Sequence, residues 1–248
     1  MITFIKRLLQ WPEVRLRCIL PLLIVLCPLV GIAQRNMVEV PSSEIIERNE
    51  FFIQGQAALN KDGLNTGIVA TYGLGHDFEL GVILYKFQFK SRTGLDTDPT
   101  HPNENPDVLI SAQKGFSLAD WLTIGIGTGC GTNVTRSNGN HRFVNFSYLN
   151  SQYKFGEQGH MVVLGGYYGN DAYVTEGSNG GVMAGIDFKL NDKLNFLADF
   201  FSGTSEISVV NTAFQVALPK EWKVTVGAQL PNPGSNNQYG GIIQISRN

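Results

Sequence analysis

The feature that most constrains this chain is an alternation of apolar and polar residues that recurs in stretches of about ten residues. In one such stretch, Phe196, Ala198 and Phe200 alternate with Asn195 and Asp199. A period of two places the two kinds of side chain on opposite faces of a β-strand. About twelve such stretches follow residue 50, near 51–60, 65–74, 78–90, 107–117, 121–131, 142–155, 161–170, 181–190, 194–203, 207–218, 222–230 and 239–246.

The breaks between these stretches alternate in length. Short turns fall at LGHD, SLAD, GEQGH, LNDK and LPKE, and longer breaks at SRTGLDTDPTHPNENP, TNVTRSNGNH, NDAYVTEGSNG, SGTSE and PNPGSNNQ. Only the first break, NKDGL, is short where a long one is expected. Strands of roughly 9 to 11 residues are long enough to cross a bilayer when tilted. The sequence therefore predicts an all-β fold, an antiparallel up-and-down transmembrane β-barrel of about 12 strands with its short turns at one end.

The two rows of alternating side chains along each strand differ in polarity, and this difference predicts which row faces lipid and which faces the lumen. One row is apolar and is predicted to face lipid, as with Ile68, Leu164 and Val226. A Lys on a lipid face costs roughly 2 to 4 kcal/mol at the bilayer midplane, so the polar row is predicted to face the lumen. The lumen-facing candidates are Gln54, Gln56, Gln113, Asp187, Lys189, Asp199, Gln215, Lys223 and Gln229.

One stretch resists this assignment. In residues 78–90, the residues Phe78, Leu80, Val82 and Leu84 share one parity, whereas Phe87 and Phe89 share the other. A β-bulge near Leu84 or Tyr85 would restore Lys86, Gln88 and Lys90 to the interior. Alternatively, residues 86–90 lie above the membrane, where facing no longer matters.

The start of the chain has the layout of a secretory signal peptide. Basic residues precede an uncharged apolar run from Cys18 to Gln34, and small residues lead up to Ala33. We expect cleavage near Ala33, with a membrane anchor or a lipoprotein attached at Cys27 as the alternatives. The predicted organisation is a signal peptide over 1–33, a periplasmic N-terminal segment over 34–49 and an outer-membrane β-barrel over 50–248.

Together, the leader, the alternating strands, the loop asymmetry and the turn-side Trp121 and Trp222 resemble those of bacterial outer-membrane β-barrel proteins. The resemblance covers residues 50–248 and involves no subfamily motif. It implies an outer-membrane location and, as partners, outer-membrane lipids, the barrel-assembly machinery, periplasmic chaperones and small solutes. One departure is the terminal Asn248, where such barrels often end in an aromatic residue.

Charge and cysteine usage exclude other classes. The chain has 19 Lys+Arg and 21 Asp+Glu, and loss of the leader makes the balance more acidic, with no basic patch. We therefore expect no nucleic-acid partner. After the leader only Cys130 remains, so no intramolecular disulfide is expected.

No motif indicates catalysis, and we expect that the chain is not an enzyme. His141 with Ser137 or Ser147 is the best version of a lipid-modifying or proteolytic site, but it lacks an orienting partner. The acidic loop over 91–106 has Asp96, Asp98 and Glu104, which are oxygen ligands suited to calcium, but three prolines favour a solvated loop. No cofactor and no metal site are expected.

Two functions remain. The first is a narrow channel or transport-type barrel for small solutes, and the second is a plugged structural or adhesive barrel. About twelve strands lies between the 8 whose interior side chains fill and the 16 or more that leave a wide channel. The mixed set Asp187, Lys189, Asp199 and Lys223 suits either a solute path or internal ion pairs.

Overall fold

The computed structural model describes residues 36–61, 63–90, 94–95, 106–134, 141–235 and 237–248. The predicted signal peptide, its cleavage site near Ala33, most of the acidic loop 91–106, and Ser137 lie outside the described residues. Within these residues the strands are β1 (Phe51–Asn60), β2 (Gly63–Gly75), β3 (Phe78–Lys90), β4 (Gly94–Leu95), β5 (Asp107–Ala119), β6 (Leu122–Asn133), β7 (Phe143–Phe155), β8 (His160–Gly169), β9 (Gly180–Lys189), β10 (Leu194–Phe201), β11 (Val209–Ala217), β12 (Trp222–Pro231) and β13 (Gly240–Arg247).

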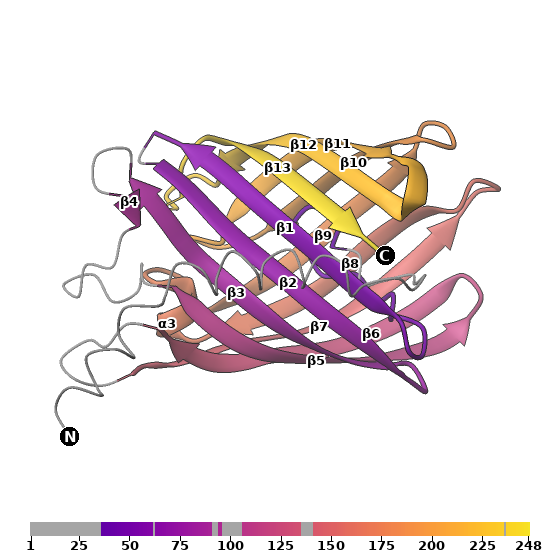
Figure 1. The fold of residues 1–248 in the computed structure, drawn as a ribbon, viewed down its shortest axis with the longest axis horizontal. Helices are drawn as coiled ribbons and strands as arrows, with labels where there is room; N and C mark the ends of the chain where they lie inside the picture. Colours follow the sequence, from indigo (N-terminus) through magenta and orange to yellow (C-terminus); the bar gives the residue numbers. More distant parts are fainter. Residues whose placement is uncertain (1–35, 62, 91–93, 96–105, 135–140, 236) are drawn as a thin grey trace, which may run out of the picture. The chain divides into compact units, whose positions relative to one another are not determined.

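These strands form one antiparallel sheet that closes on itself (Figure 1). Each long strand pairs with the next long strand along the chain, and β1 pairs with both β2 and β13. Gln54, for example, lies opposite Val69 on one side and Ser246 on the other. The two-residue β4 pairs only with β3, so twelve strands make up the ring. The predicted fold class, a 12-stranded up-and-down barrel, is confirmed.

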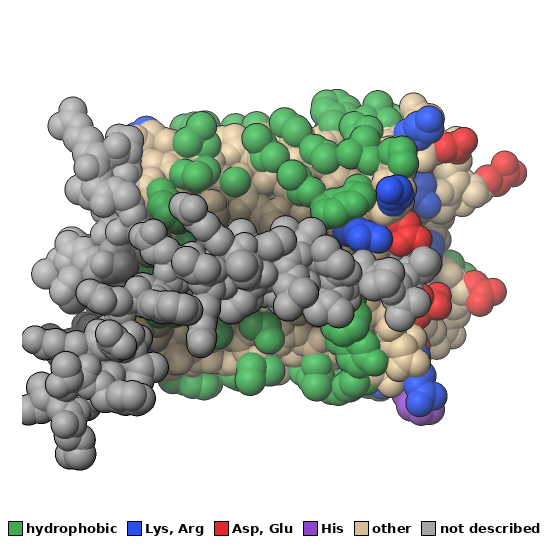
Figure 2. Space-filling view, viewed as in Figure 1, with side chains coloured by type: hydrophobic (Ala, Val, Ile, Leu, Met, Phe, Trp, Pro, Cys, Tyr) green, Lys and Arg blue, Asp and Glu red, His purple; other side chains and the backbone are tan. Residues whose placement is uncertain are grey.

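The outer surface of the barrel is apolar over its middle. Apolar side chains are exposed around the described strands, including Ile68, Ile126, Leu164 and Val226. Figure 2 shows these side chains spread over one face, with the described charged side chains gathered at the right-hand end. The short turns between β2 and β3, β7 and β8, and β9 and β10 lie at that end (Figure 1). Because side chains alternate along a strand, this outer band leaves the intervening residues facing inward.

Strand β3 contains the bulge that was one of the two alternatives for residues 78–90. Its pairing with β2 shifts, because Ile68 lies opposite Leu84 whereas Thr66 lies opposite Phe87. Lys86 has a positive φ of 59° at this point, and its ammonium group donates a 2.8 Å hydrogen bond to the Tyr173 carbonyl. The bulge therefore turns Lys86 inward, and the bulge alternative is confirmed.

Helical structure is slight. Helix α3 (Asp171–Val174) begins at Asn170, whose side chain accepts a hydrogen bond from the Tyr173 amide, and the 3-10 helix η2 (Pro219–Glu221) links β11 to β12. Over the described ranges, no helix has the length and apolar character needed to cross a membrane. Helix α3 lies in the connection between β8 and β9 and contributes buried side chains at the long-loop end of the interior.

Candidate functional site: the barrel interior

The barrel interior contains a segment of the chain itself. Residues 36–48, called the plug from here on, lead into β1 and include the buried residues Met37, Val38, Val40, Ser43 and Ile46. Hydrogen-bond partners of the plug lie on β3, β5, β7, β10 and β13, which are spread around the ring. A segment bonded to walls on several sides lies within the barrel. The prediction of a periplasmic N-terminal segment over 34–49 did not include these contacts with the barrel wall.

Asp199 on β10 is the main polar anchor of the plug. Its Oδ2 accepts hydrogen bonds from the backbone amides of Val38 (2.8 Å), Glu39 (2.5 Å) and Val40 (2.8 Å). Its Oδ1 accepts a 2.8 Å bond from the Asn211 side chain on β11. Successive backbone amides that converge on one anion form a concave nest, and here the nest belongs to the plug and the anion to the wall. Hydrogen bonds to charged groups contribute about 1.5 to 3 kcal/mol each, more than neutral ones.

Amide side chains of the wall hold the rest of the plug. Asn150 donates to the Pro41 carbonyl (2.6 Å) and accepts from the Ser43 hydroxyl (2.7 Å). The Ser43 amide donates to Gln152 (3.0 Å). Further bonds run from Gln113 to the Ser42 carbonyl (2.8 Å), from Gln244 to the Val38 carbonyl (2.6 Å) and from the Ile46 amide to Glu79 (2.8 Å). The extended plug thereby pairs its backbone groups with side chains, because it joins no strand ladder.

Apolar contacts complete the seating of the plug. Val38 packs with Leu197, Ala213 and Ile242, and Ile46 packs with Phe52. Met37 and Val40 join a larger group of buried residues that comprises Tyr148, Met161, Val163, Tyr167, Val174, Met183, Phe201 and Ile207. The inward faces of the strands are therefore not uniformly polar. Their apolar members match those of the plug, and each fully buried side chain contributes about 1.5 to 3 kcal/mol.

Small wall residues leave room for the plug. A Cβ atom at Gly73 would lie only 1.9 Å from the Glu47 carbonyl oxygen, and one at Gly185 only 2.6 Å from Cγ of Met37. Both positions belong to strands, β2 and β9, where glycine otherwise weakens the strand. Close approach of the plug, by the Glu47 backbone at Gly73 and by the Met37 side chain at Gly185, accounts for glycine at both positions.

The structure separates the nine lumen candidates by depth. Gln54, Gln113, Asp187 and Asp199 are buried, whereas Gln56, Lys189, Gln215, Lys223 and Gln229 are partly exposed. Asp199 and Gln113 contact the plug directly, and Asp187 accepts a 2.8 Å bond from Asn195. Sequence reasoning did not include Glu79, Asn150, Gln152 or Gln244 among the candidates, although each shares the inward parity of its strand. It found no signal for the plug itself.

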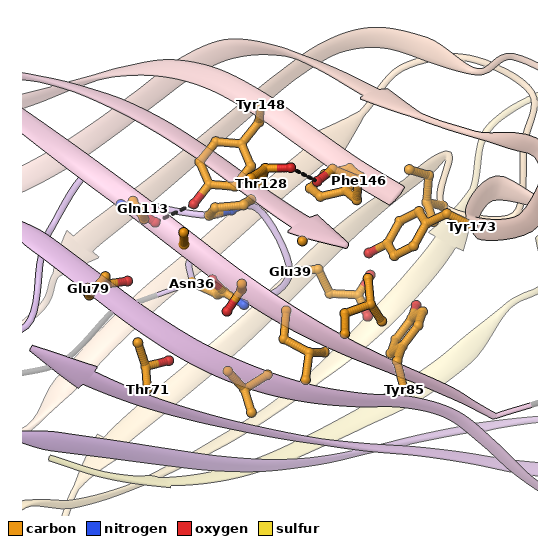
Figure 3. Close-up of a pocket in the computed structure, with 18 of the residues that line it drawn as sticks. Asn36, Glu39, Thr71, Glu79, Tyr85, Gln113, Thr128, Phe146, Tyr148 and Tyr173 are labelled. Carbon is orange, nitrogen blue, oxygen red and sulfur yellow. Dashed lines mark hydrogen bonds between the residues drawn. The ribbon is translucent and has the colours of Figure 1, made fainter. Parts of the chain in front are cut away.

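A cavity of about 110 Å³ lies between the plug and the wall formed by β2, β3, β5, β6 and β7 (Figure 3). Glu39 of the plug, Glu79 and Thr71 contribute polar atoms, and the side chain of Tyr148 donates a hydrogen bond to Gln113 beside them. Aromatic rings of Tyr85, Phe146, Tyr148, Tyr173 and Phe201 line the rest. Two buried polar atoms at this cavity, Thr71 Oγ1 and Glu79 Oε1, have no hydrogen-bond partner.

The electrostatics of the interior favour positive charge. The buried charged side chains of the described strands are the carboxylates of Glu79, Asp107, Asp187 and Asp199. Glu39 of the plug adds a half-buried carboxylate, and desolvation, followed by the charge of Asp199, raises its pKa from 4.5 to about 7. Burial likewise raises the pKa of Tyr173 in α3, with Glu39 as the next cause. A cation near Glu39 and Tyr173 would lower the pKa of both groups.

The candidate catalytic residues do not come together. The Ser147 hydroxyl lies 2.8 Å from that of Thr128 on the exposed side of the wall and also contacts Asn145, whereas His141 lies 2.9 Å from the Asn133 carbonyl. His160 stacks on Phe188 at 4.1 Å near a short turn. Within the described ranges, no group of three His, Cys, Asp or Glu side chains is placed to hold a metal ion.

Fold and interior define a class of protein: a closed twelve-stranded antiparallel β-barrel with an apolar outer surface and an interior occupied by its own N-terminal segment. No family model matches the chain, and no curated protein matches it. A solved structure that it resembles is described as the KdgM porin in complex with disordered oligogalacturonate, with a TM-score of 0.55 and 12% identity. The match covers 79% of this chain and 98% of that chain. At this identity the likeness shows a shared barrel fold.

Proposed function

We propose that this chain is an integral outer-membrane β-barrel that acts as a narrow channel for small solutes and is closed by its plug. The observation that carries the proposal is the Asp199 nest, in which one wall carboxylate holds three amides of the plug without a covalent bond. The C-terminal end of the plug continues into β1, and this is the covalent connection between the plug and the barrel. Such a segment can leave the lumen while the barrel stays closed.

The apolar outer band and the predicted leader support an outer-membrane location. On this proposal the chain contacts outer-membrane lipids, and periplasmic chaperones and the barrel-assembly machinery deliver it, as for other proteins of the class. Signal-peptide cleavage near Ala33 would leave an N-terminus two residues before the plug. The lumen residues Asp187, Lys189, Gln215, Lys223 and Gln229 then line the solute path.

The charges of the interior indicate which solutes pass. Buried carboxylates outweigh buried cations among the described lumen residues, so neutral and cationic solutes are favoured over anions. The KdgM porin is described with oligogalacturonate, a polyanion. We infer a different preference for this chain, because the described residues of its interior include no row of basic side chains that could bind an anionic sugar.

The second candidate is a structural barrel in which the plug never leaves. The same hydrogen bonds and apolar contacts that close the lumen would also stiffen the barrel. The two functions differ in whether the plug is released, and this can be measured.

The test is single-channel conductance of the purified, refolded protein in planar bilayers. Asp199→Asn removes the charge that the three amides share and keeps the size of the side chain, so we expect the open fraction to rise about tenfold or more. Asp107→Asn is the matched control, because Asp107 is a buried inward carboxylate that bonds Asn133 rather than the plug. Reversal potentials should show a cation preference. Absence of conductance in both the natural protein and Asp199→Asn would favour the structural barrel.

A further inference from the structure

We propose that the cavity between the plug and the wall binds a small organic ammonium ion of about four non-hydrogen atoms. The inference rests on the proposed function for its biological meaning, since the cavity belongs to the same lumen. Binding itself needs only the seated plug. The inference can therefore be tested without any measurement of conduction.

The size of the cavity limits the ligand. A cavity of roughly 150 Å³ holds benzene, which has six carbon atoms. The cavity beside Glu39 is smaller, at about 110 Å³. A hexose, with about twice as many non-hydrogen atoms as benzene, does not fit while the plug is seated. Trimethylammonium, with four non-hydrogen atoms, is smaller than benzene and does fit.

The charge of the lining selects a cation. Glu39 comes from the plug and Glu79 from β3, and the described residues that line the cavity include no Lys or Arg. Glu79 is only 1% exposed, and its Oε2 is occupied by the Ile46 amide while Oε1 has no partner. Figure 3 shows the carboxyl groups of Glu39 and Glu79 on the two sides of the cavity. Burial disfavours the ionised form of both carboxyl groups, and a cation bound beside them stabilises that form.

The aromatic lining selects an organic cation over a hydrated metal ion. The Tyr85 and Tyr173 rings stack at 6.0 Å between centroids, and Phe146 lies 4.8 Å from Tyr173 and 6.0 Å from Tyr148. Ring faces attract cations within about 6 Å, and aromatic cages suit methylated ammonium groups. The Lys86 ammonium already lies 6.0 Å from the Tyr173 ring centroid, so the ring faces of Tyr85, Phe146 and Tyr148 are those offered to a ligand. Water alone would satisfy Glu79 and Thr71 but gains nothing from these rings.

The probe is trimethylammonium chloride, titrated calorimetrically at neutral pH into the full mature protein in detergent. The neutral isostere propan-2-ol controls for size, and sodium chloride at equal ionic strength controls for charge alone. We expect saturable binding of trimethylammonium and none of propan-2-ol. Equal binding of propan-2-ol would overturn the electrostatic basis of the proposal, and displacement of trimethylammonium by sodium at equal concentration would show an inorganic cation site instead.

Variants locate the site. Glu79→Gln keeps the acceptor for the Ile46 amide but removes the charge, and should weaken binding about tenfold or more. Tyr85→Leu removes a ring face and should weaken it several-fold. Glu47→Gln, at an exposed position of the plug, is the matched control and should bind like the natural protein. Heat-modifiable gel migration confirms that each variant is folded. If Glu79→Gln and Tyr85→Leu lose binding but conduct like the natural protein, the cation site is supported independently of the proposed channel function. Absence of saturable binding to the natural protein would overturn the site.

Discussion

At the scale of single residues, Asp199 shows how far a sequence pattern reaches. Alternation in residues 194–203 predicts that this side chain points into the lumen, and in the structure it is buried and bonded to backbone amides of the plug. Its partners could not be predicted, because the amides that it holds lie about 160 positions earlier in the chain. An ionisable side chain at an inward position suits a solute path, an ion pair or an anchor equally well. Only the tertiary contact distinguishes them.

Glu39 gives the residue-scale prediction that depends on pH. In the seated plug it lies near Asp199, Tyr85 and Tyr173, and its pKa is about 7 rather than 4.5. In a released plug the ordinary pKa returns. The neutral form therefore favours the seated plug below pH 4.5, and this contribution is lost as the pH rises through 7. We expect the open fraction in planar bilayers to rise several-fold between pH 6 and 8. Glu39→Gln should abolish the rise, and Glu47→Gln should keep it; an unchanged rise in Glu39→Gln would assign the effect to another group.

At the scale of elements, the strands were predictable and the plug was not. Twelve stretches were expected and twelve long strands are observed, with ends that differ by a few residues, as for 207–218 against Val209–Ala217. Strands of this kind show a period of two because lipid contacts one face along their whole length. The wall strand that bonds the plug changes along its length, from β10 at Val38 to β7 at Ser43 and β3 at Ile46, so the plug has no single face against one apolar surface. Its shape comes from the cavity that it fills.

The direction in which side chains face predicts that an arginine destabilises the barrel more at an outward position than at a neighbouring inward position. Val226 on β12 is 54% exposed on the outer face, whereas Gln215 on β11 points inward and contacts Thr225. The two positions lie at nearly the same depth, because Phe214 pairs with Val226 and Gln215 with Thr225. Val226→Arg should destabilise the barrel by roughly 2 to 4 kcal/mol, because it places charge in hydrocarbon. Gln215→Arg should cost much less.

Reversible urea titrations in lipid vesicles measure both free energies of unfolding. Phe214→Arg, one residue from Gln215 and also exposed, provides a second lipid-facing test. Equal destabilisation at all three positions would show that the outer face does not contact lipid.

At the scale of the whole molecule, closure of the barrel follows from pairing between its ends. β1 and β13 lie about 190 residues apart in the chain, and their register aligns Gln56 with Gln244. A closed sheet has no free edge, so every strand satisfies its backbone groups within the ring, as a bilayer requires. Because the number of strands is even, β1 begins and β13 finishes at the same end of the barrel. The difference in length between the turns at the two ends indicates which side of the membrane that end faces.

The orientation of the barrel is the last prediction. The short turns around Asp192 and Glu221 lie at the end where β1 begins, and the loop around Gly177 lies at the opposite end. In outer-membrane barrels the short turns face the periplasm and the long loops face outward. An epitope tag at Gly177 should therefore bind antibody on intact cells, and tags at Asp192 or Glu221 should bind only after permeabilisation. Because the plug enters from the short-turn end, this orientation would also place its point of attachment on the periplasmic side. Reversed accessibility would leave the barrel fold intact but would place that attachment at the cell surface.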